Sequence, residues 1–323
     1  MRVNNKILFI IFFTGLLLGY YQTVRTDAPN YELKLTRHET IINNTIEYPY
    51  KYRLLNPYIT QIWVSALKAV IPEKPAFIGG YLIQNILVFT FMFYCLFKFF
   101  RLWFDDTGAV ISLLMFSVLV PVSLTGYDVL GDMTTAGIMA LGFYFINTSR
   151  EKLLFPLIIV AALNELQLIL LIAFYFFSKA PDFRDKKIWI NSILLTITFV
   201  ITYGTIYLIR GGSAGGGEVQ WYFTKDAAFN ISHKDWIALW FITIVPLLYF
   251  VVKGFKSKPQ FLRNSAMIVL PLFYLLAFFF IARLREIDKA LTIFTILIPL
   301  AIYTLFPKHI INTKEGIKES IKN

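Results

Sequence analysis

The sequence is poor in charged residues. Asp, Glu, Lys and Arg make up only 16% of its 323 residues, whereas soluble domains carry about 25%. Hydrophobic residues account for 57% of the chain and gather in runs of about 20 residues, long enough to cross a hydrocarbon core about 30 Å thick. This composition excludes an ordinary soluble globular protein. It predicts an all-α, polytopic membrane protein that forms a single membrane domain over residues 1–323.

Cysteine and histidine are scarce as well. The one cysteine, Cys95, lies in an apolar run, which excludes a disulfide scaffold. The three histidines, His38, His233 and His309, show no metal-ligand spacing, and no Ser/His/Asp arrangement is present. We therefore expect no cofactor, and a divalent metal is not indicated. The formal charge of +11 does not point to nucleic acid, because an excess of Lys and Arg in a membrane protein is more often a topology signal.

Eight apolar runs are long enough for full spans. The first, from Ile7 to about Tyr20, follows two basic residues as in a signal peptide, but no small-x-small cleavage site follows it. We therefore predict a retained span with a cytoplasmic N-terminus. The other spans are predicted at about 77–97, 108–125, 133–147, 188–209, 236–252, 265–282 and 290–306.

The apolar segment 153–177 decides the topology. If it is a single span, the short loops carry 12 Lys and Arg residues on the cytoplasmic side and 12 on the outer side. If it is a hairpin of two short helices, 18 lie on the cytoplasmic side and six outside. The long first loop is left out of both counts. The positive-inside rule favours the hairpin, with the basic tail 307–323 in the cytoplasm. Arms of about 12 residues span only about 18 Å. The tip, at Asn164 and Glu165, would therefore lie below the outer surface, where a carboxylate is tolerated only in protein or in a wet cavity.

The outer loop 23–76 is the only long hydrophilic stretch. It contains Asp27, and further along it places Tyr52 and Arg53 among other tyrosines. From about 57 to 71, apolar residues repeat at helical spacing, which predicts an amphipathic helix lying in the membrane interface. The alternative is that this helix is a structural collar with no part in chemistry.

Two short outer turns carry further charge. Asp128 and Asp132 lie in the first, where they either bind a ligand or simply favour the turn. The second holds Arg283, Arg285 and Glu286, more charge than a turn needs, and arginine clusters at membrane surfaces suit phosphate recognition.

The order of these features resembles that of the GT-C superfamily of glycosyltransferases, in particular its small bacterial members without a soluble domain. Asp27 follows the first span, and an aromatic-Arg-Leu-x-x-Pro stretch occupies 52–57. A broken apolar segment with Asn164 and Glu165 and an Arg-x-x-Glu turn at 283–286 come later. Many members carry a second acidic residue next to the first; in this chain Asp27 stands alone.

The resemblance implies transfer of a sugar from a polyprenyl-phosphate donor to a saccharide, lipid or protein acceptor at the outer face of the cytoplasmic (inner) membrane. It makes Asp27 the general base on the acceptor, with Glu165 as a second catalytic residue in the same cavity. The expected substrate-binding residues are Tyr52, Arg53, Asp128, Asp132, Asn164, Arg283, Arg285 and Glu286.

Three other function classes remain open. A transporter or flippase of lipid-linked saccharide would be expected to show two related halves, and no internal repeat is evident. A polysaccharide polymerase usually has a larger late outer loop than the one at 210–234. A structural membrane subunit would not need Glu165 at depth.

Overall fold

The computed structural model is helical throughout the parts of the chain that it describes. These are residues 4–46, 50–123, 129–178, 183, 185–211, 222–275, 279, 283–284 and 286–311. Within them an isolated antiparallel bridge joins Phe104 to Ile310, and helices supply the framework.

Among the described residues, five helices are long and apolar enough to cross a membrane. The eight predicted runs are helical over nearly all of their described residues, but only five of the helices are long enough to cross a membrane, so the count of eight spans stays a prediction. The five are α1 with its terminal π-turn (Asn5–Asp27), α4 (Glu73–Phe100), α6 (Val129–Asn147), α9 (Lys186–Ile209) and α11 (Asp235–Val252). The remaining apolar segments are α5 (Asp106–Ser123), α12 (Gln260–Asn264) with the π-helix Ser265–Leu275, and α14 (Leu291–Leu305).

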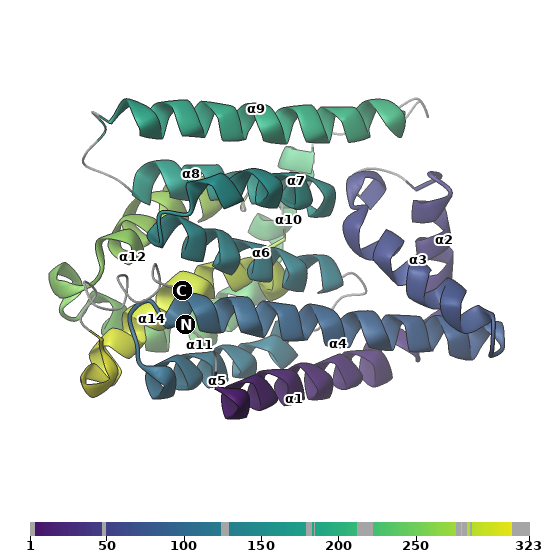
Figure 1. The fold of residues 1–323 in the computed structure, drawn as a ribbon, viewed down its shortest axis with the longest axis horizontal. Helices are drawn as coiled ribbons and strands as arrows, with labels where there is room; N and C mark the ends of the chain where they lie inside the picture. Colours follow the sequence, from purple (N-terminus) through teal and green to yellow (C-terminus); the bar gives the residue numbers. More distant parts are fainter. Residues whose placement is uncertain are drawn as a thin grey trace.

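The segment 153–177 folds as two short helices with a break between them. Helix α7 (Leu154–Asn164) ends where Glu165 adopts an extended conformation (φ −163°, ψ 142°), and α8 (Leu170–Ser178) follows a 3-10 turn. Both helices pack on α6 and on α9, and α8 leads back to the end of the bundle where α9 begins (Figure 1). The chain therefore reverses near Glu165, and the tip of the hairpin faces the first loop.

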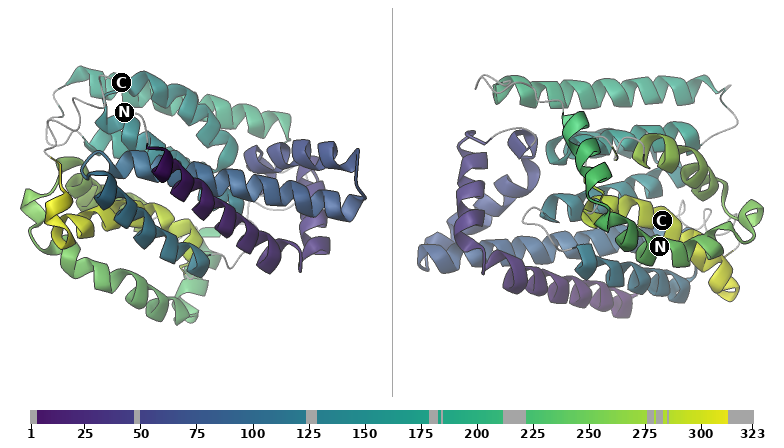
Figure 2. Two further views of the ribbon diagram at one scale, coloured as in Figure 1. Left: turned by 60° about the horizontal axis from the view of Figure 1, so that its bottom comes forward. Right: turned by 180° about the vertical axis from the view of Figure 1, so that it is seen from behind.

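The first loop contains two helices, α2 (Tyr31–Ile42) and α3 (Leu55–Lys68). All three views place them together at one end of the bundle (Figures 1 and 2). Helix α3 overlaps the amphipathic stretch predicted at about 57–71, and its place in the membrane interface stays a prediction; α2 was not predicted. The backbone N–H of Leu54 donates to the carbonyl of Leu163 over 2.9 Å, which fixes the start of α3 on the hairpin tip.

Helix α1 packs tightly on α4 through two glycines four residues apart. A Cβ on Gly15 would lie 2.8 Å from the backbone nitrogen of Thr90, and one on Gly19 would lie 2.7 Å from that of Ile86. Small residues at this spacing let two membrane helices approach closely. The contact brings the end of α1, with Asp27, next to the polar residues of α4.

Candidate functional site

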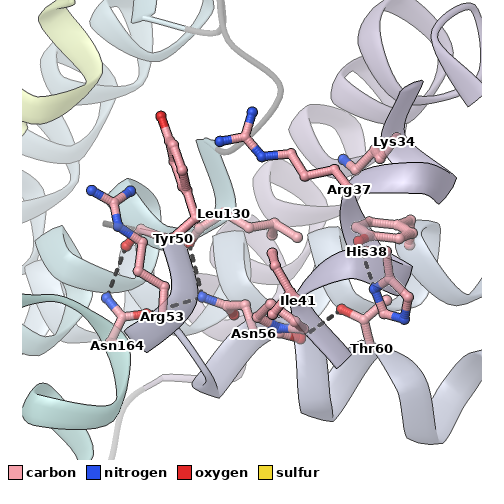
Figure 3. Close-up of a pocket in the computed structure, with 13 residues that line it drawn as sticks. Lys34, Arg37, His38, Ile41, Tyr50, Arg53, Asn56, Thr60, Leu130 and Asn164 are labelled. Atoms are coloured by element: carbon pink, nitrogen blue, oxygen red, sulfur yellow. Dashed lines mark hydrogen bonds between the residues drawn. The ribbon is translucent and has the colours of Figure 1, made fainter. Parts of the chain in front are cut away.

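A cleft opens where α2 and α3 meet the hairpin tip (Figure 3). It holds about 580 Å³ of empty space, part of it open solvent. Residues of α2, α3, α4, α6 and α7 and of the segment 50–53 line it, and most of them come from the first loop. The lining residues are Lys34, Arg37, His38, Ile41, Tyr50, Arg53, Asn56, Pro57, Thr60, Tyr81, Leu130, Gly131 and Asn164.

One face of α2 forms a wall of the cleft. Lys34, Arg37, His38 and Ile41 all line it, because residues three and four apart lie on the same side of a helix. We missed this helix in the sequence, although the spacing of these four residues was the signal that could have revealed it. Its apolar content is low, and so it does not stand out in a chain of long apolar runs.

Two asparagines join the first loop to the hairpin tip. Asn56 Nδ2 donates to Asn164 Oδ1 over 3.1 Å, and Gln84 Nε2 donates to Asn56 Oδ1 over 3.1 Å. Asn164 Nδ2 in turn donates to the Gly131 carbonyl over 3.0 Å. Both asparagines are buried, and satisfied amide networks of this kind fix one arrangement of the elements that they connect. The floor of the cleft is thereby held in place.

Arg53 and Glu165 form an ion pair beside this floor, with 2.5 Å between Arg53 Nη2 and Glu165 Oε1. Thr135 Oγ1 donates to Glu165 Oε2 over 3.1 Å, and Gln167 Nε2 donates to the same oxygen over 2.5 Å. Glu165 is only 5% exposed, so its charge is compensated within the protein. The structure thus brings Arg53, Asn164 and Glu165 together, while Glu165 itself does not line the cleft.

Asp27 lies behind the cleft. Its carboxylate is ion-paired with Lys34, and it accepts hydrogen bonds from Gln22 Nε2 at 3.4 Å and Asn85 Nδ2 at 2.7 Å. The residue is 3% exposed and does not line the cleft. Its role as the general base stays a prediction, and in this conformation the carboxylate is enclosed rather than open to the cleft. The reason is that a carboxylate buried among membrane helices needs a counter-charge, and Lys34, one helix further along the chain, supplies it.

Two arginines lie over the same tyrosine ring. The Cζ of Arg37 is 3.8 Å from the centroid of Tyr50, and the Cζ of Arg53 is 5.1 Å from it. Figure 3 shows both guanidinium groups on the same side of the cleft floor as Tyr50. Lys34 Nζ lies 4.1 Å from the centroid of the Tyr81 ring. Such cation–π contacts hold long cationic side chains in place, so three oriented cationic side chains line the cleft; Lys34 is paired with Asp27 and Arg53 with Glu165.

His38 lines the cleft, although its position in the sequence indicated no role beyond metal binding. Its Nδ1 lies 3.0 Å from the Tyr81 hydroxyl, and its Nε2 lies 2.7 Å from Gln61 Oε1. Burial is the main cause that lowers the pKa of His38 below its ordinary value of 6.5. The imidazole is therefore neutral near pH 7.

Tyr52 and Asp132 are buried away from the cleft. The Tyr52 ring packs against Tyr203 and Tyr207 of α9, with centroids 5.7 and 5.4 Å apart. Asp132, at the start of α6, interacts electrostatically with Lys289. Neither residue lines the cleft, so the structure does not place them at the surface where a ligand would bind.

None of the described residues of the second outer turn lines the cleft, although Arg53 lies close enough to Lys289 to lower its pKa. Burial opposes the charge of Lys289, but Asp132 and Glu286 outweigh it and raise the pKa of Lys289; Glu286 Oε2 lies 2.6 Å from Lys289 Nζ. Arg283 is exposed and lies over the Phe229 ring at 4.7 Å. Asp128 and Arg285 lie outside the described residues.

Comparisons with known proteins add no assignment. No protein-family model matches this chain, and searches of curated proteins and of solved structures found no match either. Over the described residues, no group of three or more His, Cys, Asp or Glu side chains is arranged to hold a metal ion.

Proposed function

We propose that this chain is a membrane glycosyltransferase that moves a sugar from a polyprenyl-phosphate donor to an acceptor at the outer face of the cytoplasmic membrane. The observation that carries the proposal is the convergence of Lys34, Arg37 and Arg53 on one cleft. Guanidinium and ammonium groups held in this way are suited to a phosphate. The Tyr81 hydroxyl, which lines the same cleft, provides a partner for a sugar hydroxyl.

The two faces of α3 support a place at the membrane surface. Asn56 and Thr60 are buried, while Tyr58 is 45% and Ile62 is 64% exposed. A helix on the surface of a soluble protein buries its apolar residues and exposes its polar ones. The opposite distribution on α3 fits a helix that turns its apolar side to lipid. A lipid-borne phosphate would then enter the cleft with its tail still in the bilayer. The eight spans and the cytoplasmic termini belong to the same proposal, and the distribution of Lys and Arg supports them.

The chemistry follows from these positions. The acceptor oxygen attacks the anomeric carbon, and the electron pair of the breaking carbon–oxygen bond leaves with the lipid phosphate. Arg37 and Arg53 would stabilise the charge that grows on that phosphate. Asp27, the base that the resemblance implies, could take the proton of the acceptor only after Lys34 has turned from its carboxylate to the phosphate. Glu165 holds Arg53 in this scheme.

The experiment is transfer by the purified protein in lipid nanodiscs. A panel of polyprenyl-phosphate hexoses and pentoses would be incubated with saccharide and lipid acceptors, and the products detected by mass spectrometry. Transfer by the wild type, lost in Arg37→Gln and retained in the control Arg25→Gln, supports the proposal; Arg25 is exposed and does not line the cleft. Saturable binding of a donor without transfer to any acceptor would instead favour a transporter or flippase. No binding of any donor would leave a structural role.

A further inference from the structure

Tyr81 and His38 form a hydrogen-bonded pair on the wall of the cleft, with 3.0 Å between the Tyr81 hydroxyl and His38 Nδ1. The orientation of the pair follows from Gln61. The Gln61 amide nitrogen donates to Ser65 Oγ over 3.1 Å, which directs Gln61 Oε1 to His38 Nε2 at 2.7 Å. An amide oxygen only accepts, so Nε2 carries the proton. Nδ1 therefore has the free lone pair and accepts the hydroxyl proton of Tyr81.

We infer that Tyr81 and His38 are the proton-accepting pair of this cleft: Tyr81 contacts the acceptor hydroxyl, and His38 acts through Tyr81. The inference rests on the proposed function and names its base. The Tyr81–His38 pair can accept a proton without rearrangement, whereas the ion pair between Asp27 and Lys34 would first have to break. Tyr81 reaches the cleft from α4 and His38 from α2, so the pair exists only when the first loop is docked.

As the acceptor oxygen bonds to the anomeric carbon, its proton passes to the Tyr81 oxygen, and the proton of Tyr81 passes to His38 Nδ1. Tyr81 remains neutral, and His38 becomes an imidazolium whose Nε2–H stays on Gln61. The electron pair of the broken carbon–oxygen bond leaves with the lipid phosphate. His38 returns its proton to solvent when the products leave.

The surroundings of His38 favour the neutral form that this role requires. Burial has the largest effect and lowers its pKa, and Lys34 on α2 and Lys68 on α3 act in the same direction; the Gln61 hydrogen bond and Glu39 on α2 oppose them. Tyr81 and Phe77 of α4 face the ring as a neutral phenol and an apolar ring. Because the pKa is lowered, the active neutral form persists below pH 6.5 and is lost only as pH falls through the folded-state pKa.

The first test is the pH dependence of kcat between about pH 5 and about pH 8. We expect kcat to fall on the acid side with an inflection below pH 6.5, and this acid limb to disappear in His38→Gln and in Tyr81→Phe. A general base contributes about 10²- to 10⁴-fold, so each variant should lose at least about 10²-fold in kcat with little change in KM for the donor. His233→Gln, a histidine that does not line the cleft, is the control and should leave kcat and the profile unchanged.

The second test does not depend on turnover. With three histidines in the chain, the imidazole nitrogens can be labelled with ¹⁵N, and His38→Gln assigns the His38 signals. We expect the tautomer with hydrogen on Nε2, and a change at Nδ1 in Tyr81→Phe. The tautomer with hydrogen on Nδ1 would overturn the inference.

The two proposals fail in different ways. No transfer by the wild type with any donor overturns the proposed function, and the inference with it. Transfer by the wild type whose rate and acid limb persist in Tyr81→Phe overturns the inference alone. Tyr81→Phe keeps the ring over which Lys34 lies, so its elution on size exclusion should match the wild type and exclude misfolding as the cause of a lost rate.

Discussion

Arg53 and Glu165 meet at 2.5 Å across more than a hundred residues of chain, and this ion pair joins the first loop to the tip of the membrane hairpin. Glu165→Gln keeps the shape of the side chain but removes the charge opposite Arg53. Truncating one partner of a buried pair costs about 3 kcal/mol or more, so we expect a clearly lower thermal midpoint in nanodiscs. Glu73→Gln, which removes an exposed partner of Lys68, should cost at most about 1 kcal/mol.

The same substitution should affect ligand binding in the opposite direction. Because the substitution removes the negative charge that faces Arg53, a fluorescent polyprenyl phosphate should bind Glu165→Gln more tightly than the wild type at low salt. The difference should shrink as salt is raised, because salt screens partly exposed charges. Unchanged affinity at all salt concentrations would remove Arg53 from the phosphate site.

The substitution Asp27→Asn distinguishes two roles for Asp27: a general base, or a residue that positions Lys34. Because the carboxylate is enclosed by Lys34, Gln22 and Asn85, we expect kcat to stay within about tenfold of the wild type while KM for the donor changes. A loss of about 10²- to 10⁴-fold in kcat at unchanged KM is the effect of a missing base and would restore Asp27 to that role. Steady-state transfer rates over a range of donor concentrations decide between them.

The contact between α1 and α4 should not tolerate a side chain at Gly15. Gly15→Ala puts a methyl group against the backbone of Thr90, and overpacking of this kind costs about 1–3 kcal/mol. Gly204→Ala is the control, because a Cβ there has no neighbour within 4 Å. Thermal unfolding of the two variants in parallel should show destabilisation in the first alone. Equal midpoints would mean that α1 packs elsewhere.

The proposed orientation can be tested with introduced cysteines. The native Cys95 is buried, so the wild type should react little with a membrane-impermeant maleimide. Thr36→Cys on α2 should be labelled from outside the membrane, whereas Lys152→Cys and Lys256→Cys should be labelled only after permeabilisation; all three positions are exposed in the fold. Labelling of Lys256→Cys from outside would favour a single span at 153–177.

The sequence by itself identified the helices whose signal is local. Long apolar runs predicted α1, α4, α6, α9 and α11, because about 20 consecutive apolar residues are typical of a helix that crosses a membrane. It also located the break at Asn164 and Glu165, since those polar residues interrupt a run that is otherwise apolar. The amphipathic spacing that gave α3 was equally local.

What only the tertiary structure decided is which side chains share a cavity. Asp27 follows the first span as expected, yet Lys34 covers it. A buried carboxylate needs a counter-charge, and the order of residues in the sequence does not show which cation supplies it. His38 and Tyr81 are 43 positions apart, and no spacing rule connects them; they meet because two glycines let α1 approach α4 and Asn56 fixes α3 on the hairpin. The local sequence thus determined the helices, while packing between helices chose the walls of the cleft.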